Sequence, residues 1–248
     1  MRVLLVTSQI TYVPRNYLDL FDELFSNSSQ HIAGLIILKN LSPAIIAKAA
    51  GLWLMGCKGI SRCLLRNVAE LPLRRREKLF QRQGLPVQRV GSMNDPNVVR
   101  WVSQQEFDWI VNLRTRCIYK EDILSAPKQG CMNIHHGILP DYRGTLCDLY
   151  ALSEGRPAGF TIHNMNKKID AGRIFVRKEI SVPGETNYIK YLSRSGKEEG
   201  RALSDLLNQI SESGCAPEGM QNNSENPVFT RNPNRRQVAE MIHRGMIL

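Results

Sequence analysis

The feature that most constrains the fold is a set of continuous apolar runs separated by segments of helical pattern. Apolar residues recur at helical spacing in residues 17–25 and 97–105. Strands that are apolar throughout are typical of parallel sheets buried on both faces. The sequence therefore predicts an α/β fold with a doubly wound, mostly parallel sheet. Four runs have the length and composition of its buried strands: residues 2–7, 31–38, 85–90 and 108–113.

The second half of the chain continues the alternation less regularly. Residues 214–227 are rich in Gly, Asn, Ser and Pro and are predicted to form a loop. We expect a main domain over residues 1–185 and a short, mainly helical C-terminal extension over residues 186–248. The pattern predicts, in order, a short helix, two strands and two helices: residues 147–153, 159–165, 172–182, 187–213 (with a break considered at Ser195-Gly196) and 237–246.

Composition limits the kind of protein that this chain can be. The 248 residues are 42% hydrophobic, enough to bury a substantial core. The six cysteines include no C-x-x-C pair, so neither disulfides nor a zinc site is predicted and a cytoplasmic, reducing setting is favoured. The N-terminal apolar run is too short for a signal peptide. The longest run elsewhere, residues 49–57, is below the roughly 20 residues that span a bilayer.

Positive charge is concentrated in one segment. The formal net charge is +10, and residues 44–90 contain ten Lys or Arg against two Glu. The segment from Ser42 to Gly84 is longer than one crossover helix requires, and its apolar spacing predicts one or two amphipathic helices. We favour a helical cover over the sheet or a contact in a homodimer. The alternative is a surface for nucleic acid, a nucleotide or acidic lipid, with Trp53 among the lipid head groups.

Residues capable of chemistry gather past the middle of the chain. Asn133 and His135 are two residues apart, the spacing of one face of a strand. Three of the five histidines, His135, His136 and His163, lie close together, and Asp170 follows in an Asp-Ala-Gly turn. An amide, imidazoles and a carboxylate are the groups needed to move an acyl group onto an amine.

Two strings, CMNIHHGILPDYRG and GFTIHNMNKKIDAGRI, together resemble the signature of the formyltransferase family that uses 10-formyltetrahydrofolate. That family includes glycinamide ribonucleotide, methionyl-tRNA and amino-sugar formyltransferases, and the resemblance extends over residues 107–182. It implies a Rossmann-like catalytic domain, here residues 1–185, with 10-formyltetrahydrofolate as formyl donor and no metal. It also implies that Asn133, His135 and Asp170 are catalytic, with His163 in support.

The resemblance implies binding residues as well. The amine acceptor would lie near Gly144, Ser8 and Gln9. The planar guanidinium of Arg143 suits a phosphate of the acceptor, while a helix-capping or surface role is the alternative. Two loops would hold the pterin of the folate, largely through backbone groups: Arg116, Cys117, Ile118 and Tyr119, then Asn166, Lys167, Lys168 and Ile169.

Two departures from the family pattern bear on the site. Many relatives carry Pro-Ser or Gly-Ser where this chain has His136-Gly137. His136 is either a second active imidazole or, as we favour, a neighbour on the opposite face of the strand. The segment Ser8-Gln9-Ile10-Thr11 lacks the glycine-rich phosphate cradle expected of glycinamide ribonucleotide enzymes. A purine precursor is therefore not the acceptor that we expect.

These residues suggest a mechanism. An amine would attack the formyl carbon while Asn133 and a protonated His135 stabilise charge on the formyl oxygen. His135, or a water held by Asp170, would take the proton of the amine. A buried Asp170 beside the imidazole is expected to raise the pKa of His135 and keep it protonated near neutrality.

The favoured function is N-formyl transfer to a small acceptor, an amino sugar linked to a nucleotide. The basic segment suggests methionyl-tRNA instead, but the tRNA enzymes carry a C-terminal β-barrel, and only about sixty residues follow the catalytic part here. A 10-formyltetrahydrofolate hydrolase needs the same residues but usually has an N-terminal regulatory domain, which the immediate start on a strand argues against. The remaining alternative is a non-catalytic protein on this scaffold that binds RNA or a membrane surface.

Overall fold

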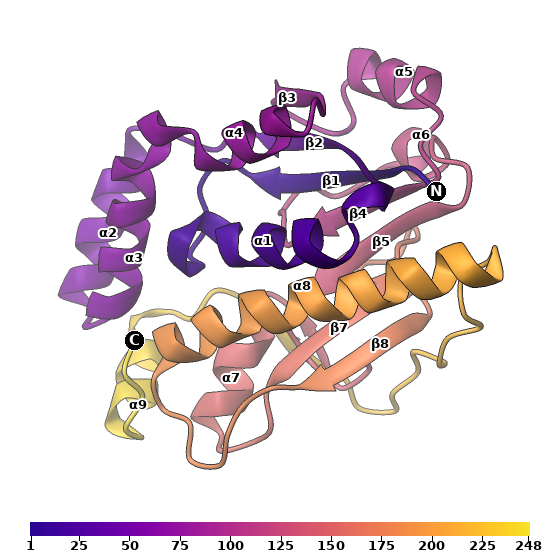
Figure 1. The fold of residues 1–248 in the computed structure, drawn as a ribbon. Coiled ribbons are helices and arrows are strands. Elements are labelled where there is room, and N and C mark those ends of the chain that lie inside the picture. Colours follow the sequence, from indigo (N-terminus) through magenta and orange to yellow (C-terminus); the bar gives the residue numbers. More distant parts are fainter.

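The computed structural model describes residues 1–248, which are organised around a seven-stranded sheet (Figure 1). Neighbouring strands from β3 to β5 run parallel, while β7 is antiparallel to both of its neighbours. The prediction of a mostly parallel α/β sheet is confirmed. In spatial order the strands are β3 (Val87–Val90), β2 (Ile32–Leu38), β1 (Val3–Ser8), β4 (Trp109–Leu113), β5 (Gly130–His135), β7 (Gly159–Asn164) and β8 (Ile174–Glu179).

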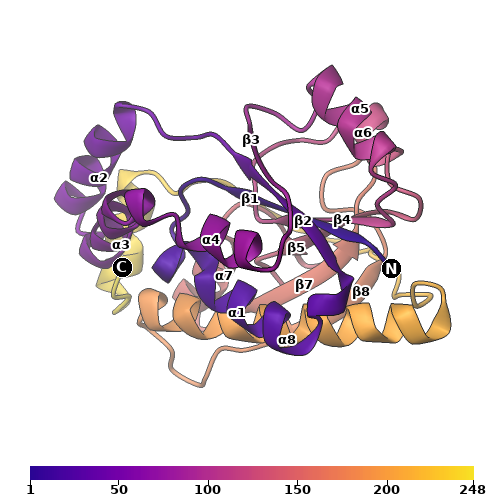
Figure 2. The same ribbon diagram turned by 45° about the horizontal axis from the view of Figure 1, so that its top comes forward.

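Helices cover both faces of the sheet because the central strands are apolar on both sides. In β1, Val3 and Leu5 face one layer of helices, whereas Leu4 and Val6 face the other. Figure 2 shows the sheet between these layers, with α1 and α8 on one side and α5 and α6 on the other. The first layer consists of α1 (Leu18–Asn27), α4 (Arg75–Arg82) and α8 (Tyr188–Ser213), and the second of α5 (Pro96–Gln104) and α6 (Glu121–Leu124).

α8 is one continuous helix, without the break considered at Ser195-Gly196. Ser195 is buried, and its hydroxyl donates to Glu199 one turn later, so this polar group has a partner inside the protein. Gly200 lets α8 approach α1 closely, because a Cβ at this position would lie 2.7 Å from the backbone oxygen of Leu20. The helix thus shares the main core, while the domain boundary at residue 185 stays a prediction.

A small two-stranded sheet was not predicted. β6 (Tyr142–Gly144) pairs in parallel with β9 (Val228–Thr230), which follows the loop expected over residues 214–227. β9 is three residues long and two of its side chains are exposed, so it lacks the apolar run on which strand prediction depends. The pairing requires glycine at position 144, where a Cβ would lie 2.2 Å from the backbone oxygen of Thr230.

The basic segment between β2 and β3 contains more helices than the one or two predicted. α4 covers the sheet as expected, with Phe80 fully buried, but α2 has Ala49 as its only buried residue. The expectation of a helical cover is therefore wrong for α2. No helix in the chain combines the length and the apolar character needed to cross a membrane. The segment comprises α2 (Ala44–Leu54), α3 (Lys58–Ala69), a 3-10 turn (Leu71–Leu73) and α4.

Buried charged and polar groups meet beyond the end of β5. The Nδ1 atom of His136 lies 3.0 Å from an Asp148 oxygen, and its Nε2 atom faces Glu199. The Tyr17 hydroxyl donates to the other Glu199 oxygen at 2.6 Å, and an Arg114 nitrogen lies 3.7 Å from Asp148. We call these five residues the buried charge network. Asp148 belongs to α7 (Cys147–Ser153) and Glu199 to α8, while Tyr17 immediately precedes α1.

The buried charge network is electrically balanced. Both nitrogens of His136 face carboxylate oxygens, and only the imidazolium form donates to both. Burial opposes the ionisation of Asp148 and Glu199, but His136 and Arg114 outweigh it and lower the pKa of both carboxyls. The partners of His136 all belong to this network, in agreement with a neighbour on the face of β5 opposite His135.

The approach of α8 to α1 can be tested with two glycines of the same helix. Gly200→Ala is expected to lower the free energy of unfolding by about 1–3 kcal/mol, because the added methyl group meets the α1 backbone. Gly196→Ala is the control, since nothing lies within 4 Å of its Cβ, and alanine there should stabilise the helix by up to about 1 kcal/mol. Urea unfolding of both variants checks this, and equal effects would contradict the close approach.

The buried charge network can be tested with adjacent glutamates. Glu199→Gln is expected to lower the free energy of unfolding by about 3–5 kcal/mol, because it leaves a buried positive charge uncompensated. Glu198→Gln removes only contacts to Lys178 and Arg201 at the surface and should cost less than about 1 kcal/mol. Chemical unfolding of the two variants gives the comparison, and a Glu199→Gln protein as stable as the parent would rule out a charged network.

Candidate active site

The predicted catalytic residues come together where β5 meets the antiparallel strand β7. Asn133 lies opposite His163 in the strand register, and their Nδ2 and Nε2 atoms are 3.2 Å apart. Asp170 reaches the same place from the loop after β7. One of its carboxylate oxygens is 3.6 Å from His135 Nδ1 and 3.7 Å from His163 Nε2. The four residues thus form one cluster, in which both histidines are buried.

The amide of Asn133 has a fixed orientation. Asn112 on β4 donates its Nδ2 to the Asn133 oxygen at 2.8 Å, and the Thr115 hydroxyl donates to the Asn112 oxygen at 2.6 Å. His163 donates from Nδ1 to the carbonyl oxygen of Asn164 at 2.8 Å, so its Nε2 accepts from Asn133. Asn133 keeps a second N–H for a ligand. Neither Asn112 nor Thr115 was predicted, although an asparagine inside the apolar run WIVNL is unusual enough to indicate a functional position.

Asp170 is held as an ionised carboxylate. Gly144 donates its backbone N–H to one carboxylate oxygen at 3.1 Å, while the other oxygen faces the two imidazoles. Asn222 fixes the backbone of the loop by donating to the carbonyl oxygen of Asp170 at 3.0 Å. Burial opposes ionisation, but the attraction of His135 and His163 and the bond from Gly144 outweigh it and lower the pKa of Asp170 to about 2.

The protonation of His135 differs from the expectation. Burial lowers the pKa of His135 more than Asp170 raises it, and His163 lowers it further. The prediction that Asp170 keeps this imidazole protonated is therefore wrong, because it left out the cost of burying a charged ring. Nε2 lies 2.9 Å from the carbonyl oxygen of Tyr142 and carries the hydrogen of the neutral ring. Nδ1 is then an unprotonated acceptor on the side of Asp170.

The two loops predicted to hold a pterin follow β4 and β7. Lys167 in the second loop pairs at 2.8 Å with Glu121, the first residue of α6 after the first loop. Ile118 and Ile169 are 64% and 61% exposed, so each loop presents apolar surface to solvent. Tyr119 instead packs in the core between the sheet and α5.

The other residues of these loops have local partners. Arg116 donates to the side chain of Asn232 at 2.8 Å, and Cys117 is half-buried. The Asn166 oxygen accepts the backbone N–H of Lys168 at 2.9 Å. The role of the two loops in binding a folate stays a prediction.

The residues predicted to contact the acceptor have partners within the protein. The carbonyl oxygens of Ser8 and Gln9 accept from the buried guanidinium of Arg76 at 2.9 and 2.7 Å. Arg143 donates to the carbonyl oxygen of Asn222 at 2.9 Å. The guanidinium of Arg143 is thus engaged in holding a neighbouring loop, which favours a structural role over phosphate binding.

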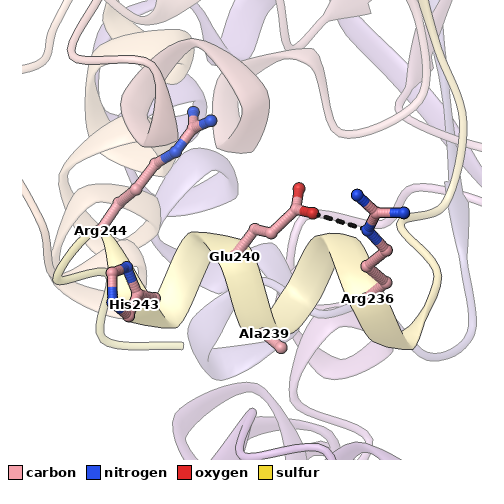
Figure 3. A pocket seen from close by; sticks show the side chains of 5 residues that line it. All are labelled: Arg236, Ala239, Glu240, His243 and Arg244. Carbon is pink, nitrogen blue, oxygen red and sulfur yellow. Dashed lines mark hydrogen bonds and ion pairs between the residues drawn. The ribbon is translucent and has the colours of Figure 1, made fainter.

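A surface hollow of about 390 Å³ lies away from this cluster, along α9 (Arg235–His243). An ion pair of 2.9 Å joins Arg236 and Glu240 at its edge. None of the predicted site residues lines the hollow, so we assign it no function. No group of three or more His, Cys, Asp or Glu side chains is arranged to hold a metal ion. Figure 3 shows the residues that line the hollow: Arg236, Ala239, Glu240, His243 and Arg244.

Comparison with known sequences assigns the chain to a family. Residues 73–207, more than half of the chain, match the family described as formyl transferase. The methionyl-tRNA formyltransferase of Thermotoga neapolitana is 35% identical over 108 residues, which cover 43% of this chain and 34% of that protein. The chain thus spans little more than a third of the length of the curated relatives that it matches.

Solved structures resemble the chain over most of its length. A sugar N-formyltransferase from Shewanella sp FDAARGOS_354 matches with a TM-score of 0.59 and 16% identity, over 98% of this chain and 87% of that one. A phosphoribosylglycinamide formyltransferase from Anaplasma phagocytophilum matches with a TM-score of 0.61 and 17% identity, over 94% and 99% of the two chains. At such identities the likeness concerns the fold, whereas the sequence match fixes the family. The chain belongs to the formyl transferase family.

Proposed function

We propose that this chain transfers a formyl group from 10-formyltetrahydrofolate to a primary amine. The observation that carries the proposal is the convergence of an oriented amide donor, a neutral imidazole and an ionised carboxylate. These groups are Asn133 Nδ2, His135 Nδ1 and the Asp170 carboxylate. Membership of the family supports the same chemistry.

Asn133 would stabilise the charge that develops on the formyl oxygen. One N–H of its Nδ2 group is directed at His163, which leaves the other for that oxygen. Because Asn112 holds the amide from the opposite side, the donor does not have to reorient during the reaction. Loss of one such donor typically lowers a rate by about 10²–10³-fold.

The proton of the amine would pass to His135. As the amine attacks the formyl carbon, its nitrogen loses a proton to the unprotonated Nδ1 of His135. The Asp170 carboxylate, 3.6 Å away, stabilises the imidazolium that forms. The imidazolium then protonates the folate nitrogen as the bond from that nitrogen to the formyl carbon breaks. The products are a formamide and tetrahydrofolate.

The formyl donor would bind between the loops after β4 and β7. Ile118 and Ile169 offer apolar contacts to a pterin, and the backbone around them offers hydrogen-bonding groups. An exposed ion pair between Lys167 and Glu121 joins the second loop to the element that follows the first. Bound in this way, the folate would present its formyl group to Asn133.

For the acceptor we favour an amino sugar linked to a nucleotide. The likeness in fold to the Shewanella sugar N-formyltransferase extends over nearly the whole chain, including residues 186–248 in large part. The high net positive charge of +10 suits a substrate with phosphates. Methionyl-tRNA is the second candidate, because the curated sequence relatives act on it by name, although they share only part of their length with this chain.

Formyl transfer is tested by replacing the residues proposed to accept or stabilise the proton of the amine. His135→Gln or Asp170→Asn is expected to lower the rate at least about 10²-fold, because each removes a group that accepts or stabilises the proton. The exposed His243→Gln on α9 is the control and should keep the parent rate. The assay incubates each protein with 10-formyltetrahydrofolate and a panel of nucleotide-linked amino sugars and charged tRNA, and reads formylated product by mass.

The same assay separates the alternatives. Near-normal transfer by both site variants would refute the assigned roles. Formate as the only product would identify a hydrolase, and formylated tRNA alone would favour the second candidate. Absence of folate turnover together with binding of RNA would point to a non-catalytic protein.

The dependence of the rate on pH follows from the neutral His135. Since burial lowers its pKa below the usual 6.5, kcat/KM, corrected for the measured ionisation of the acceptor amine, should stay constant from pH 8 to below pH 6.5. It should then fall as His135 becomes protonated. Asp170, with a pKa of about 2, adds no change in this range. An acid limb centred above pH 7 would contradict the lowered pKa of His135, and a rate that falls as the pH rises would show that His135 acts in the protonated form.

The residual activity of Asp170→Asn tests the direction in which Asp170 shifts the pKa of His135. Asp170 raises the pKa of His135, so its replacement should move the acid limb to lower pH. A shift to higher pH would mean that another group controls the limb.

A further inference from the structure

α2 is an apolar helix that the rest of the chain leaves uncovered. Its sequence is AIIAKAAGLWL, with Lys48 as the only charged residue and Ala49 as the only buried one. Ile46, Trp53 and Leu54 are 54%, 41% and 83% exposed. Figures 1 and 2 both show α2 at the outer edge of the molecule, beyond α3. A surface helix normally turns such residues inward, and clustered exposed apolar residues are typical of interaction sites.

Positive charge surrounds this apolar surface. The Lys58 Nζ and the Arg62 guanidinium carbon lie 5.9 and 5.1 Å from the centre of the Trp53 ring. Residues 39–69 contain no Asp or Glu. The partner of α2 should therefore offer both an apolar region that can bury these side chains and negative charge beside it. The cations of this stretch are Lys39, Lys48, Lys58, Arg62 and Arg66.

Of the three partners that could cover α2, one satisfies both features. A second copy of the chain, joined about a two-fold axis, would set the same cations against each other. RNA would pair with the cations but leave Ile46 and Leu54 in water. An anionic bilayer places phosphates at the level of Lys and Arg, Trp at the interface and aliphatic side chains in the hydrocarbon. We propose that α2 and the start of α3 dock on the surface of an anionic lipid bilayer.

The docked surface would lie beside the turn that follows β1. Ala49 packs with Ile10, and the Asn67 side chain of α3 donates to the carbonyl oxygens of Thr11 and Val13 at 3.0 and 2.8 Å. If the proposed function holds, this turn is on the acceptor side of the site, so the enzyme would meet its acceptor at a membrane surface. Docking itself does not depend on formyl transfer.

Flotation with lipid vesicles tests the proposal without folate or acceptor. The full chain should bind vesicles of phosphatidylcholine and phosphatidylglycerol, bind phosphatidylcholine alone at least tenfold more weakly, and dissociate as salt is raised. Lys58→Gln with Arg62→Gln should weaken binding about thirty-fold, from about 1 kcal/mol for each cation. Ile46→Ser with Leu54→Ser should weaken it at least tenfold, since each lost buried methylene costs about 0.8 kcal/mol.

Exposed residues elsewhere on the chain provide matched controls for these variants. Val182→Ser and Arg100→Gln change an exposed apolar and an exposed basic residue elsewhere and should bind as the parent does. All these positions are exposed, and unaltered thermal unfolding will verify folding. Equal binding to neutral vesicles, or no binding, overturns the proposal. If the chain does not bind vesicles but self-associates, and Ile46→Ser with Leu54→Ser abolishes that self-association, the partner of α2 is a second copy. If it does not bind vesicles but binds RNA in a salt-sensitive way, the partner is RNA. Either result overturns the proposal.

Discussion

The structure depends on the placement of His136 between two buried carboxylates, with Arg114 completing the balance of charge. An isolated buried ion costs several kcal/mol, so none of these groups is tolerated unless the others are in place. Asp148 and Glu199 come from different helices, and Tyr17 adds the turn before α1. The network therefore requires α7, α8 and that turn to pack against the ends of β4 and β5 together.

The proposed catalytic cluster is positioned by the buried charge network because His135 and His136 are consecutive. The partners of His136 fix the backbone at the end of β5, and the Tyr142 carbonyl oxygen then fixes the ring of His135 on the other face. Asn133, two residues earlier, is held from the neighbouring strand by Asn112. Donors and acceptors that are held in place before the reaction need no reorganisation during it, which is where most electrostatic catalysis originates.

The features that the sequence predicted are those with a local signal. The central strands are continuous apolar runs, and Asn133, His135 and Asp170, predicted through a resemblance to family motifs, lie together in the fold. The strand β9 has no such signal because its stability comes from pairing with distant β6. The exposure of α2 was not predicted. Apolar periodicity indicates that one face of a helix should be covered, but it does not identify the element or partner that covers it. The predicted protonation state of His135 was wrong because the pKa of the ring depends on its burial, which only the folded chain defines.

The turn after β1 shows how tertiary contacts replace a motif. Arg15, Asn16 and Tyr17 have positive φ angles of 54°, 53° and 71°, which cost roughly 1–2 kcal/mol per residue outside glycine. The side chain of Asn16 and the anchoring of Tyr17 to Glu199 hold this backbone. A glycine-rich cradle binds phosphate through free N–H groups, but here those groups are used within the protein. A phosphate on the acceptor would therefore need cations from side chains, because this backbone has no free N–H groups to offer. The engaged N–H groups belong to Gln9, Ile10, Thr11, Val13 and Asn16.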